Sequence, residues 1–259
     1  MASQEITKTL PNLHPIGADK QNARERLIIA LDVPTMDAAL SLTERLESQC
    51  KWLKIGLELY IAAGPPIVEK LVSLGHSVFL DLKLHDIPNT VASAVRSATS
   101  LGASMLTIHA AGGPAMLAAA QNATVGLPDP PQLLAVTVLT SMNQEQLSAI
   151  GVSRSPQEQV ELLARMGLGV GIRGFVCSPQ EVAALRSLTG PEGVLVIPGI
   201  RPTGADQGDQ QRIATPAKAI EQGASYLVVG RPITQTPDPA RAAEAILKEI
   251  QEALNTQSA

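Results

Sequence analysis

The sequence predicts an α/β fold made of a single (β/α)8 barrel, the TIM-barrel architecture, and three observations lead to that prediction. Short apolar runs rich in β-branched residues alternate eight times with longer stretches of helical spacing, which is the pattern of βαβ units. The eight units occupy roughly 230 residues, a size typical of such a barrel. Hydrophobic residues make up 45% of the chain but aromatic residues only 2%, so the core must be aliphatic. That composition suits helices packed closely on a parallel sheet.

The predicted elements alternate along the chain from residue 27 to residue 254. The strands are expected at 27–32, 51–55, 77–83, 104–109, 133–138, 174–177, 194–198 and 225–230. The helices are expected at 35–48, 66–74, 87–100, 113–125, 155–167, 178–188, 216–222 and 238–254. The second unit is the weakest, because Pro65-Pro66 can only open a helix. A doubly wound open sheet is the alternative, but it would need a glycine-rich turn after the first strand, and residues 32–35 (DVPT) do not form one.

Composition also limits the class of protein. A net charge of −4 and an isoelectric point near 5.6 give no basic surface for nucleic acid, and there are few aromatic residues on which bases could stack. Cys50 and Cys177 match no metal-ligand spacing and no disulfide framework, as expected in a reducing compartment. No apolar run approaches the length of about 18 residues that a membrane span needs. We therefore expect a cytoplasmic protein with no membrane partner, a flexible extension at 1–22 and one barrel domain at 23–259.

Charged residues lie where buried parallel strands should be apolar. Asp32, Lys54, Asp81 and Lys83 fall at the C-terminal ends of the first three predicted strands. Residues two apart share a face of a strand, so Asp81 and Lys83 should point together into the barrel mouth, with the intervening leucines under the helices. A structural ion-pair cluster is one interpretation. The other is a catalytic site, since alternating charges would fix a lysine as a proton donor.

Two connections are long enough to serve such a site. Residues 139–154 follow the fifth predicted strand and residues 201–215 follow the seventh. In a barrel both lie at the C-terminal ends of the strands, where active sites are built.

Residues 81–90 (DLKLHDIPNT) resemble the signature segment of the orotidine 5′-phosphate decarboxylase family. Six further segments between about residues 25 and 250 strengthen the resemblance: 31–34 (LDVP), 54–56 (KIG), 139–141 (LTS), 198–202 (PGIRP), 209–211 (DQQ) and 229–231 (VGR). The D-x-K-x-x-D element alone is less specific, because metal-dependent phosphosugar-processing barrels share it. Those relatives lack the continuation at 87–90 and the late Gln210.

The resemblance implies decarboxylation of orotidine 5′-monophosphate to UMP in de novo pyrimidine biosynthesis, with no metal and no cofactor. It assigns proton donation at C6 to Lys83, places Asp81 beside the substrate carboxylate, and makes Asp86 reach the neighbouring site of a homodimer. The implied substrate-binding residues are Asp32 and Lys54 for the ribose, Thr140 and Ser141 for the pyrimidine, Arg201, Gln210, Gly230 and Arg231 for the phosphate, and also Ile87, Thr90 and Pro198. Loops after the seventh and eighth strands are the usual phosphate site of a barrel, which supports this assignment independently.

Three other functions fit parts of the pattern. One is a metal-dependent phosphosugar lyase or synthase of the wider suprafamily, and another is an inactive barrel that binds a nucleotide as a sensor. A Schiff-base aldolase using Lys54 or Lys83 is disfavoured, because flanking carboxylates keep a lysine protonated and poorly nucleophilic. His109 at the end of the fourth strand is expected to be structural. The other three histidines form no ligand cluster, so no metal site is expected.

Overall fold

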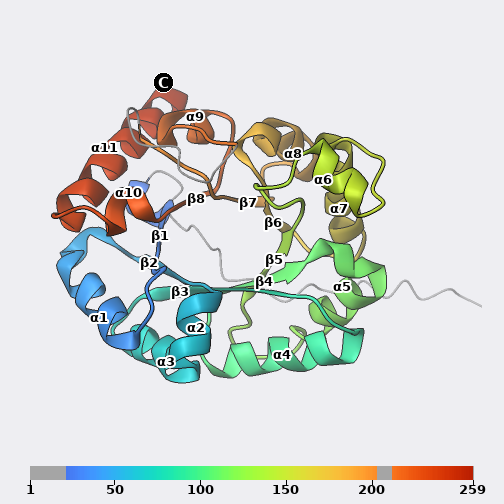
Figure 1. The fold of residues 1–259 in the computed structure, drawn as a ribbon, viewed down its shortest axis with the longest axis horizontal. Coiled ribbons are helices and arrows are strands. Elements are labelled where there is room, and N and C mark those ends of the chain that lie inside the picture. Colours follow the sequence, from blue (N-terminus) through green and yellow to red (C-terminus); the bar gives the residue numbers. More distant parts are fainter. Residues whose placement is uncertain (1–21, 203–211, 259) are drawn as a thin grey trace, which may run out of the picture.

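The computed structural model describes residues 22–202 and 212–258, and its strands form one closed parallel barrel. Each strand pairs with the next along the chain, and the last pairs with the first. Figure 1 shows the ring of strands with the helices around its outside. The strands are β1 (Leu27–Ala30), β2 (Trp52–Ile55), β3 (Ser77–Leu84), β4 (Met105–His109), β5 (Gln132–Val136), β6 (Gly174–Val176), β7 (Val194–Ile197) and β8 (Tyr226–Val229). The predicted fold class is confirmed.

The helices follow the strands in the predicted alternation. They are α1 (Met36–Arg45), α2 (Leu57–Ala63), α3 (Pro65–Ser73), α4 (Pro88–Ser100), α5 (Gly113–Asn122), α6 (Gln144–Ala149), α7 (Pro156–Gly169), α8 (Val182–Thr189), α9 (Pro216–Glu221), α10 (Arg231–Thr234) and α11 (Pro239–Ser258). Short 3₁₀ turns are η1 (Ala23–Glu25), η2 (Glu47–Gln49), η3 (Ala110–Gly112) and η4 (Pro179–Glu181). The extension predicted at 1–22 lies, except for Asn22, outside the described residues.

Local chemistry explains where the helices begin and where the observed helices differ from the predicted ones. Proline stands in the first turn of α3, α4 and α7, where its missing N–H costs nothing. The helix predicted at 35–48 ends at Arg45, because Glu47 takes a left-handed φ of 51°. Helices α2, α6 and α10 were not predicted. Each spans seven residues or fewer, too short for a helical period to show in the sequence.

The core has an outer and an inner part. The larger apolar cluster lies between the strands and the surrounding helices. The smaller one fills the barrel interior and consists of Ile28, Ala30, Trp52, Phe79, Met105, Leu134, Val196, Tyr226 and Val228. Trp52 and Tyr226 begin their strands, and their rings meet edge to face with centroids 5.4 Å apart. Bulky apolar side chains therefore close the N-terminal end of the barrel.

No helix within the described parts of the chain has both the length and the apolar character that a membrane crossing requires.

Candidate active site

The four charged residues singled out from the sequence form one alternating chain at the C-terminal ends of β1, β2 and β3. Lys54 Nζ lies 2.8 Å from Asp32 Oδ1 and 3.8 Å from Asp81 Oδ2. Lys83 Nζ lies 2.8 Å from Asp81 Oδ1. The side chains of Lys54 and Asp81 are 10% and 14% exposed, so water screens their charges little. Each lysine is thus held in place by at least one carboxylate.

Asp81 and Lys83 meet, although not through the regular alternation that the sequence analysis assumed. Strand β3 pairs with β4 at Leu80 and again at Leu84, and the register shifts between these two points. Within this irregular stretch Lys83 has a φ of 49°, a left-handed conformation that is costly for a residue with a side chain. Strain of this kind persists where surrounding contacts hold it, and it is common at functional sites.

Thr107 on β4 supplies such a contact, and the sequence analysis did not single it out. The backbone N–H of Lys83 donates to Thr107 Oγ1 over 2.8 Å, and that hydroxyl donates to Asp81 Oδ1 over 3.0 Å. Thr107 is fully buried. One hydroxyl therefore fixes both the strained backbone of the lysine and the carboxylate beside it. The sequence feature that could have identified Thr107 is its position as a polar residue between the apolar residues of β4.

Gly56 leaves room for the ion pair between Lys54 and Asp32. A Cβ at this position would lie 2.9 Å from Lys54 Nζ and 3.2 Å from Asp32 Oδ1. The glycine follows β2 and has an ordinary extended backbone, so its small size matters here rather than its conformational freedom.

These residues line a cavity of about 430 Å³ at the barrel mouth, a volume within the usual range for a small-molecule site. The inner side chains of the barrel form its floor. The lining comprises Ala30, Asp32, Lys54, Phe79, Asp81, Lys83, Val136, Val138, Leu139, Thr140, Val176, Cys177, Pro198, Gly199, Arg201, Val228, Gly230, Arg231 and Gln235. Nine of the predicted site residues are among them: Asp32, Lys54, Asp81, Lys83, Thr140, Pro198, Arg201, Gly230 and Arg231.

Three of the four residues expected to bind phosphate, Arg201, Gly230 and Arg231, line the cavity beyond β7 and β8. Arg201 is buried, and its Nη1 donates to the carbonyl of Ile200 over 2.9 Å. Its backbone N–H donates to Ala214 O over 2.9 Å, so the chain on either side of residues 203–211 is joined. Arg231 is exposed and follows Gly230 at the start of α10. Gln210 lies outside the described residues.

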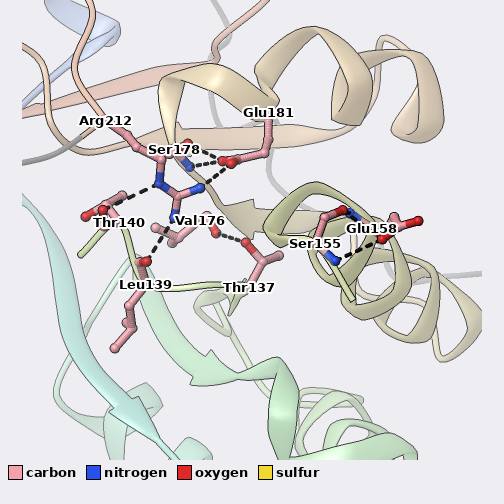
Figure 2. Close-up of polar contacts among 9 residues, drawn as sticks. All are labelled: Thr137, Leu139, Thr140, Ser155, Glu158, Val176, Ser178, Glu181 and Arg212. Atoms are coloured by element: carbon pink, nitrogen blue, oxygen red, sulfur yellow. Dashed lines mark hydrogen bonds and ion pairs between the residues drawn. The ribbon is translucent and has the colours of Figure 1, made fainter. Parts of the chain in front are cut away.

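The residues expected to bind the pyrimidine follow β5. Thr140 lines the cavity, whereas Ser141 is exposed beside it and is not part of the lining. Arg212 Nη2 donates to Leu139 O over 2.9 Å, and its Nε lies 3.5 Å from Thr140 O. Figure 2 shows the guanidinium between these carbonyls and Glu181. Sequence analysis did not identify Arg212 or Glu181. The sequence could have indicated a role for Glu181 in helix capping, because it stands three residues after Ser178 in a capping-box pattern.

Asp86, Ile87 and Thr90 lie away from the cavity. Asp86 Oδ1 accepts the N–H of Ile87 over 2.6 Å, and the two residues line a separate shallow recess with His85, Pro88, Ala111 and Gly112. Thr90 is exposed in the first turn of α4 and lines neither space. The chain thus turns away from the cavity after β3 ends at Leu84, and Pro88 begins α4.

His109 has a structural contact. Its ring nitrogen Nδ1 accepts the N–H of Ala111 over 3.3 Å, and its ring stacks on that of His85 with centroids 5.2 Å apart. Burial, and then the charges of His85 and Lys83, lower the pKa of His109 below its ordinary value. A neutral ring suits this contact, because Nδ1 must be unprotonated to accept the N–H of Ala111.

The two cysteines and the possible metal ligands do not add a reactive group to the site. Cys50 and Cys177 are buried free thiols. Cys177 lines the cavity, but burial and the nearby Glu181 raise the pKa of its thiol, so the group stays protonated near neutral pH. Within residues 22–202 and 212–258, no three His, Cys, Asp or Glu side chains gather in an arrangement that could hold a metal ion.

Comparison with known proteins shows which family has this sequence and fold. The sequence model described as Orotidine 5′-phosphate decarboxylase / HUMPS family matches residues 25–246. Proteins named orotidine 5′-phosphate decarboxylase are 53% identical in Nitrosococcus oceani, over 88% of this chain and 98% of that protein, and 49% identical in Moorella thermoacetica, over 90% and 94%. The crystal structure of orotidine 5′-phosphate decarboxylase from Lactobacillus acidophilus is similar with a TM-score of 0.77 at 38% identity, covering 87% of this chain and 98% of that one. This chain therefore belongs to the orotidine 5′-phosphate decarboxylase family.

Proposed function

We propose that the protein decarboxylates orotidine 5′-monophosphate to UMP in de novo pyrimidine biosynthesis, with Lys83 as the proton donor. The observation that carries this proposal is the alternating chain of Asp32, Lys54, Asp81 and Lys83 inside the cavity. Loss of CO₂ from an orotate ring leaves an electron pair at C6 with no conjugated group to accept it. The site must therefore supply positive charge and a proton at that carbon, and an ammonium held by a carboxylate supplies both.

In the proposed reaction, the bond between C6 and the carboxylate breaks and CO₂ leaves. Its electron pair stays on C6 and takes a proton from Lys83 Nζ, which water reprotonates after UMP has left. Asp81 lies 2.8 Å from that nitrogen, so it orients the ammonium. In this scheme Asp81 also stands beside the departing carboxylate. No electron is gained or lost overall.

Contacts remote from C6 hold the rest of the nucleotide in this scheme. Arg201, Arg231, Gly230 and Gln210 take the phosphate, and a planar guanidinium is well matched to phosphate oxygens. Asp32 and Lys54 take the ribose hydroxyls, while Thr140 and Ser141 take the pyrimidine, with Pro198 at the wall of the cavity. Binding energy from these contacts places C6 against Lys83.

We propose that turnover needs neither metal nor cofactor, because Lys83, held by Asp81, brings both a positive charge and a proton to the reacting carbon. The experiment follows orotidine monophosphate in the ultraviolet with purified protein in excess EDTA. Undiminished turnover supports the proposal. Turnover of orotidine monophosphate that disappears with EDTA and returns with a divalent metal would contradict the metal-free reaction. No turnover under either condition would instead favour the second candidate, a metal-dependent phosphosugar enzyme of the wider suprafamily.

We also propose that the active unit is a homodimer in which Asp86, together with Ile87 and Thr90, completes the partner's site. In the single chain Asp86 is exposed outside the cavity, and Ile87 beside it is 68% exposed, which a second copy could cover. A two-fold interface makes this exchange reciprocal.

Complementation tests the shared site. Lys83→Ala and Asp86→Ala proteins should each be nearly inactive, but a heterodimer of the two has one intact site. Random re-pairing gives half heterodimers, so the mixture should recover about one quarter of wild-type activity. Mass spectrometry of differently tagged chains first confirms subunit exchange. If exchanged mixtures stay as inactive as their parents, Asp86 serves its own subunit.

The cellular location is a further part of the proposal. Free thiols at Cys50 and Cys177 fit a reducing compartment, and we infer the cytoplasm. Fractionation of cells, with the activity followed in each fraction, checks this.

A further inference from the structure

A buried ion pair lies beside the cavity without lining it. The side chains of Arg212 and Glu181 are 10% and 5% exposed, and Arg212 Nη1 contacts Glu181 Oε1. The other carboxylate oxygen, Oε2, accepts the backbone N–H of Ser178 over 2.8 Å and also its hydroxyl. Burying two charges is costly, and apolar residues of similar volume often serve stability as well. Stability alone therefore does not explain this pair.

The remaining nitrogens of Arg212 turn toward the segment after β5. Nη2 donates to Leu139 O over 2.9 Å, and Nε lies 3.5 Å from Thr140 O (Figure 2). These two consecutive residues line the cavity. A guanidinium is planar and rigid, so fixing one edge on Glu181 also fixes the direction of its other donors. The carboxylate thereby sets the position of two carbonyls that it does not touch.

The backbone near Arg212 is tied to the opposite side of the cavity. Ala214, two residues further on, forms an isolated bridge with Ile200 and accepts the N–H of Arg201 over 2.9 Å. Arg201 is one of the residues to which the proposed function gives the phosphate. Arg212 therefore connects the phosphate side of the cavity, through its backbone, with the segment proposed to contact the pyrimidine, through its side chain.

We propose that Arg212, oriented by Glu181, is a positioning residue that sets residues 139–141 against the pyrimidine ring. The inference rests on the proposed function, because it takes the ring of a pyrimidine nucleotide to lie against Thr140 and Ser141. Without the guanidinium, Leu139 and Thr140 lose a shared anchor, and Leu139 is already 36% exposed. Contacts with the ring should then weaken while contacts with the phosphate persist.

The experiment compares two ligands that differ by the base. UMP and ribose 5-phosphate share the phosphate, so the ratio of their affinities, measured by calorimetry, reports on the pyrimidine contacts. The test variant is Arg212→Met combined with Glu181→Gln, which leaves no unpaired buried charge. We expect the preference for UMP to fall by about 10-fold or more, the scale of losing hydrogen bonds to one charged group. In the same variant, kcat/KM for orotidine monophosphate should fall at least as much.

Two further variants make the result specific. Arg212→Lys keeps the charge but offers one compact ammonium in place of a fork, so it should fold normally and lose part of the preference for UMP. If the double variant fails to fold, the affinity ratio measured with Arg212→Lys tests the positioning role instead. Arg186→Met is the matched control: Arg186 is also a partly buried arginine that binds loop carbonyls, but it lies at the N-terminal ends of β7 and β8. It should lower Tm without changing the ratio.

Different results would overturn the positioning role of Arg212 and the proposed function. If the folded double variant, or Arg212→Lys in its place, keeps the wild-type ratio, the positioning role is overturned. If the wild-type protein binds UMP no better than ribose 5-phosphate, the pyrimidine site itself is wrong, and the proposed function fails with it.

Discussion

Two arginines hold loop carbonyls at opposite ends of the barrel, and their surroundings differ. Arg186 lies at the N-terminal end, where its guanidinium binds the carbonyls of Gly190, Gly193 and Gly223, each over 2.7 Å. Arg212 lies at the C-terminal end, where its guanidinium is shared between a carboxylate and two carbonyls of the cavity wall. The first joins loops that carry no proposed substrate contact. The second joins loops that do.

The barrel interior shows the same contrast. At the N-terminal end the rings of Trp52 and Tyr226 meet and apolar side chains fill the space. At the C-terminal end the interior holds two acids and two bases, and one of these lysines has a left-handed backbone. One end is thus built for stability, whereas the other keeps charge and strain that stability alone does not require. Substitutions of the same residue type at the two ends should therefore have different effects.

The largest difference is expected between two lysines. Lys83→Ala should remove nearly all turnover but leave UMP affinity largely intact, because its ammonium acts at C6 and the phosphate contacts are remote. Lys51→Ala, just before β2, breaks a partly exposed pair with Glu25 worth about 0–1 kcal/mol and should leave kcat unchanged. Steady-state kinetics and UMP titrations measure both. A Lys83→Ala protein with near-normal kcat would contradict the proposed proton donor.

A second pair of variants compares two exposed arginines. Arg231→Ala, beside the cavity, should lower kcat/KM by several powers of ten, because a charge-assisted phosphate contact helps to position the reacting ring. Arg173→Ala, just before β6 at the other end, should change it little. Rates with orotidine monophosphate and with orotidine, which lacks the phosphate, provide the check. Equal rates for the two substrates would show that the phosphate site is misassigned.

Two buried threonines give a finer comparison. Thr107→Val leaves the N–H of Lys83 and the carboxylate of Asp81 without their hydroxyl partner. We expect kcat to fall by about 10- to 100-fold, the rate equivalent of one lost buried hydrogen-bond partner, and Thr107→Ser to restore most of it. Thr137→Val removes a hydroxyl whose acceptor, Val176 O, still receives a backbone N–H, so its effect should be much smaller. Comparable losses in both variants would remove the special role of Thr107.

The smallest effect concerns acid stability, in which the two ends should agree. Burial lowers the pKa of His109 at one end and of His76 at the other below the ordinary 6.5. The unfolded chain therefore takes up these protons at a higher pH than the folded protein does. Stability from the neutral rings is present above about pH 6.5 and is lost as the pH falls toward the lowered values. Tm measured between pH 7.5 and 5.5 should drop less in His109→Asn and His76→Asn than in wild type.

The sequence by itself determined the barrel and the charged residues that line the cavity. Eight apolar runs at regular spacing left few other folds, and charged residues at strand ends stood out because buried parallel strands are otherwise apolar. The motif at 81–90 then indicated which lysine and which carboxylates to expect together. These signals are local, since each depends on residues within one strand or one turn.

The tertiary structure decided the contacts that cross between elements. Thr107 is an ordinary buried threonine in the sequence, and only the irregular pairing of β3 with β4 places its hydroxyl beside Asp81 and the backbone of Lys83. Arg212 and Glu181 lie 31 residues apart and share no periodic pattern, yet folding buries them together. The physical reason is that local patterns report which face of an element is apolar, whereas a hydrogen bond between distant elements depends on strand register and loop path, which are set by the packing of the whole barrel.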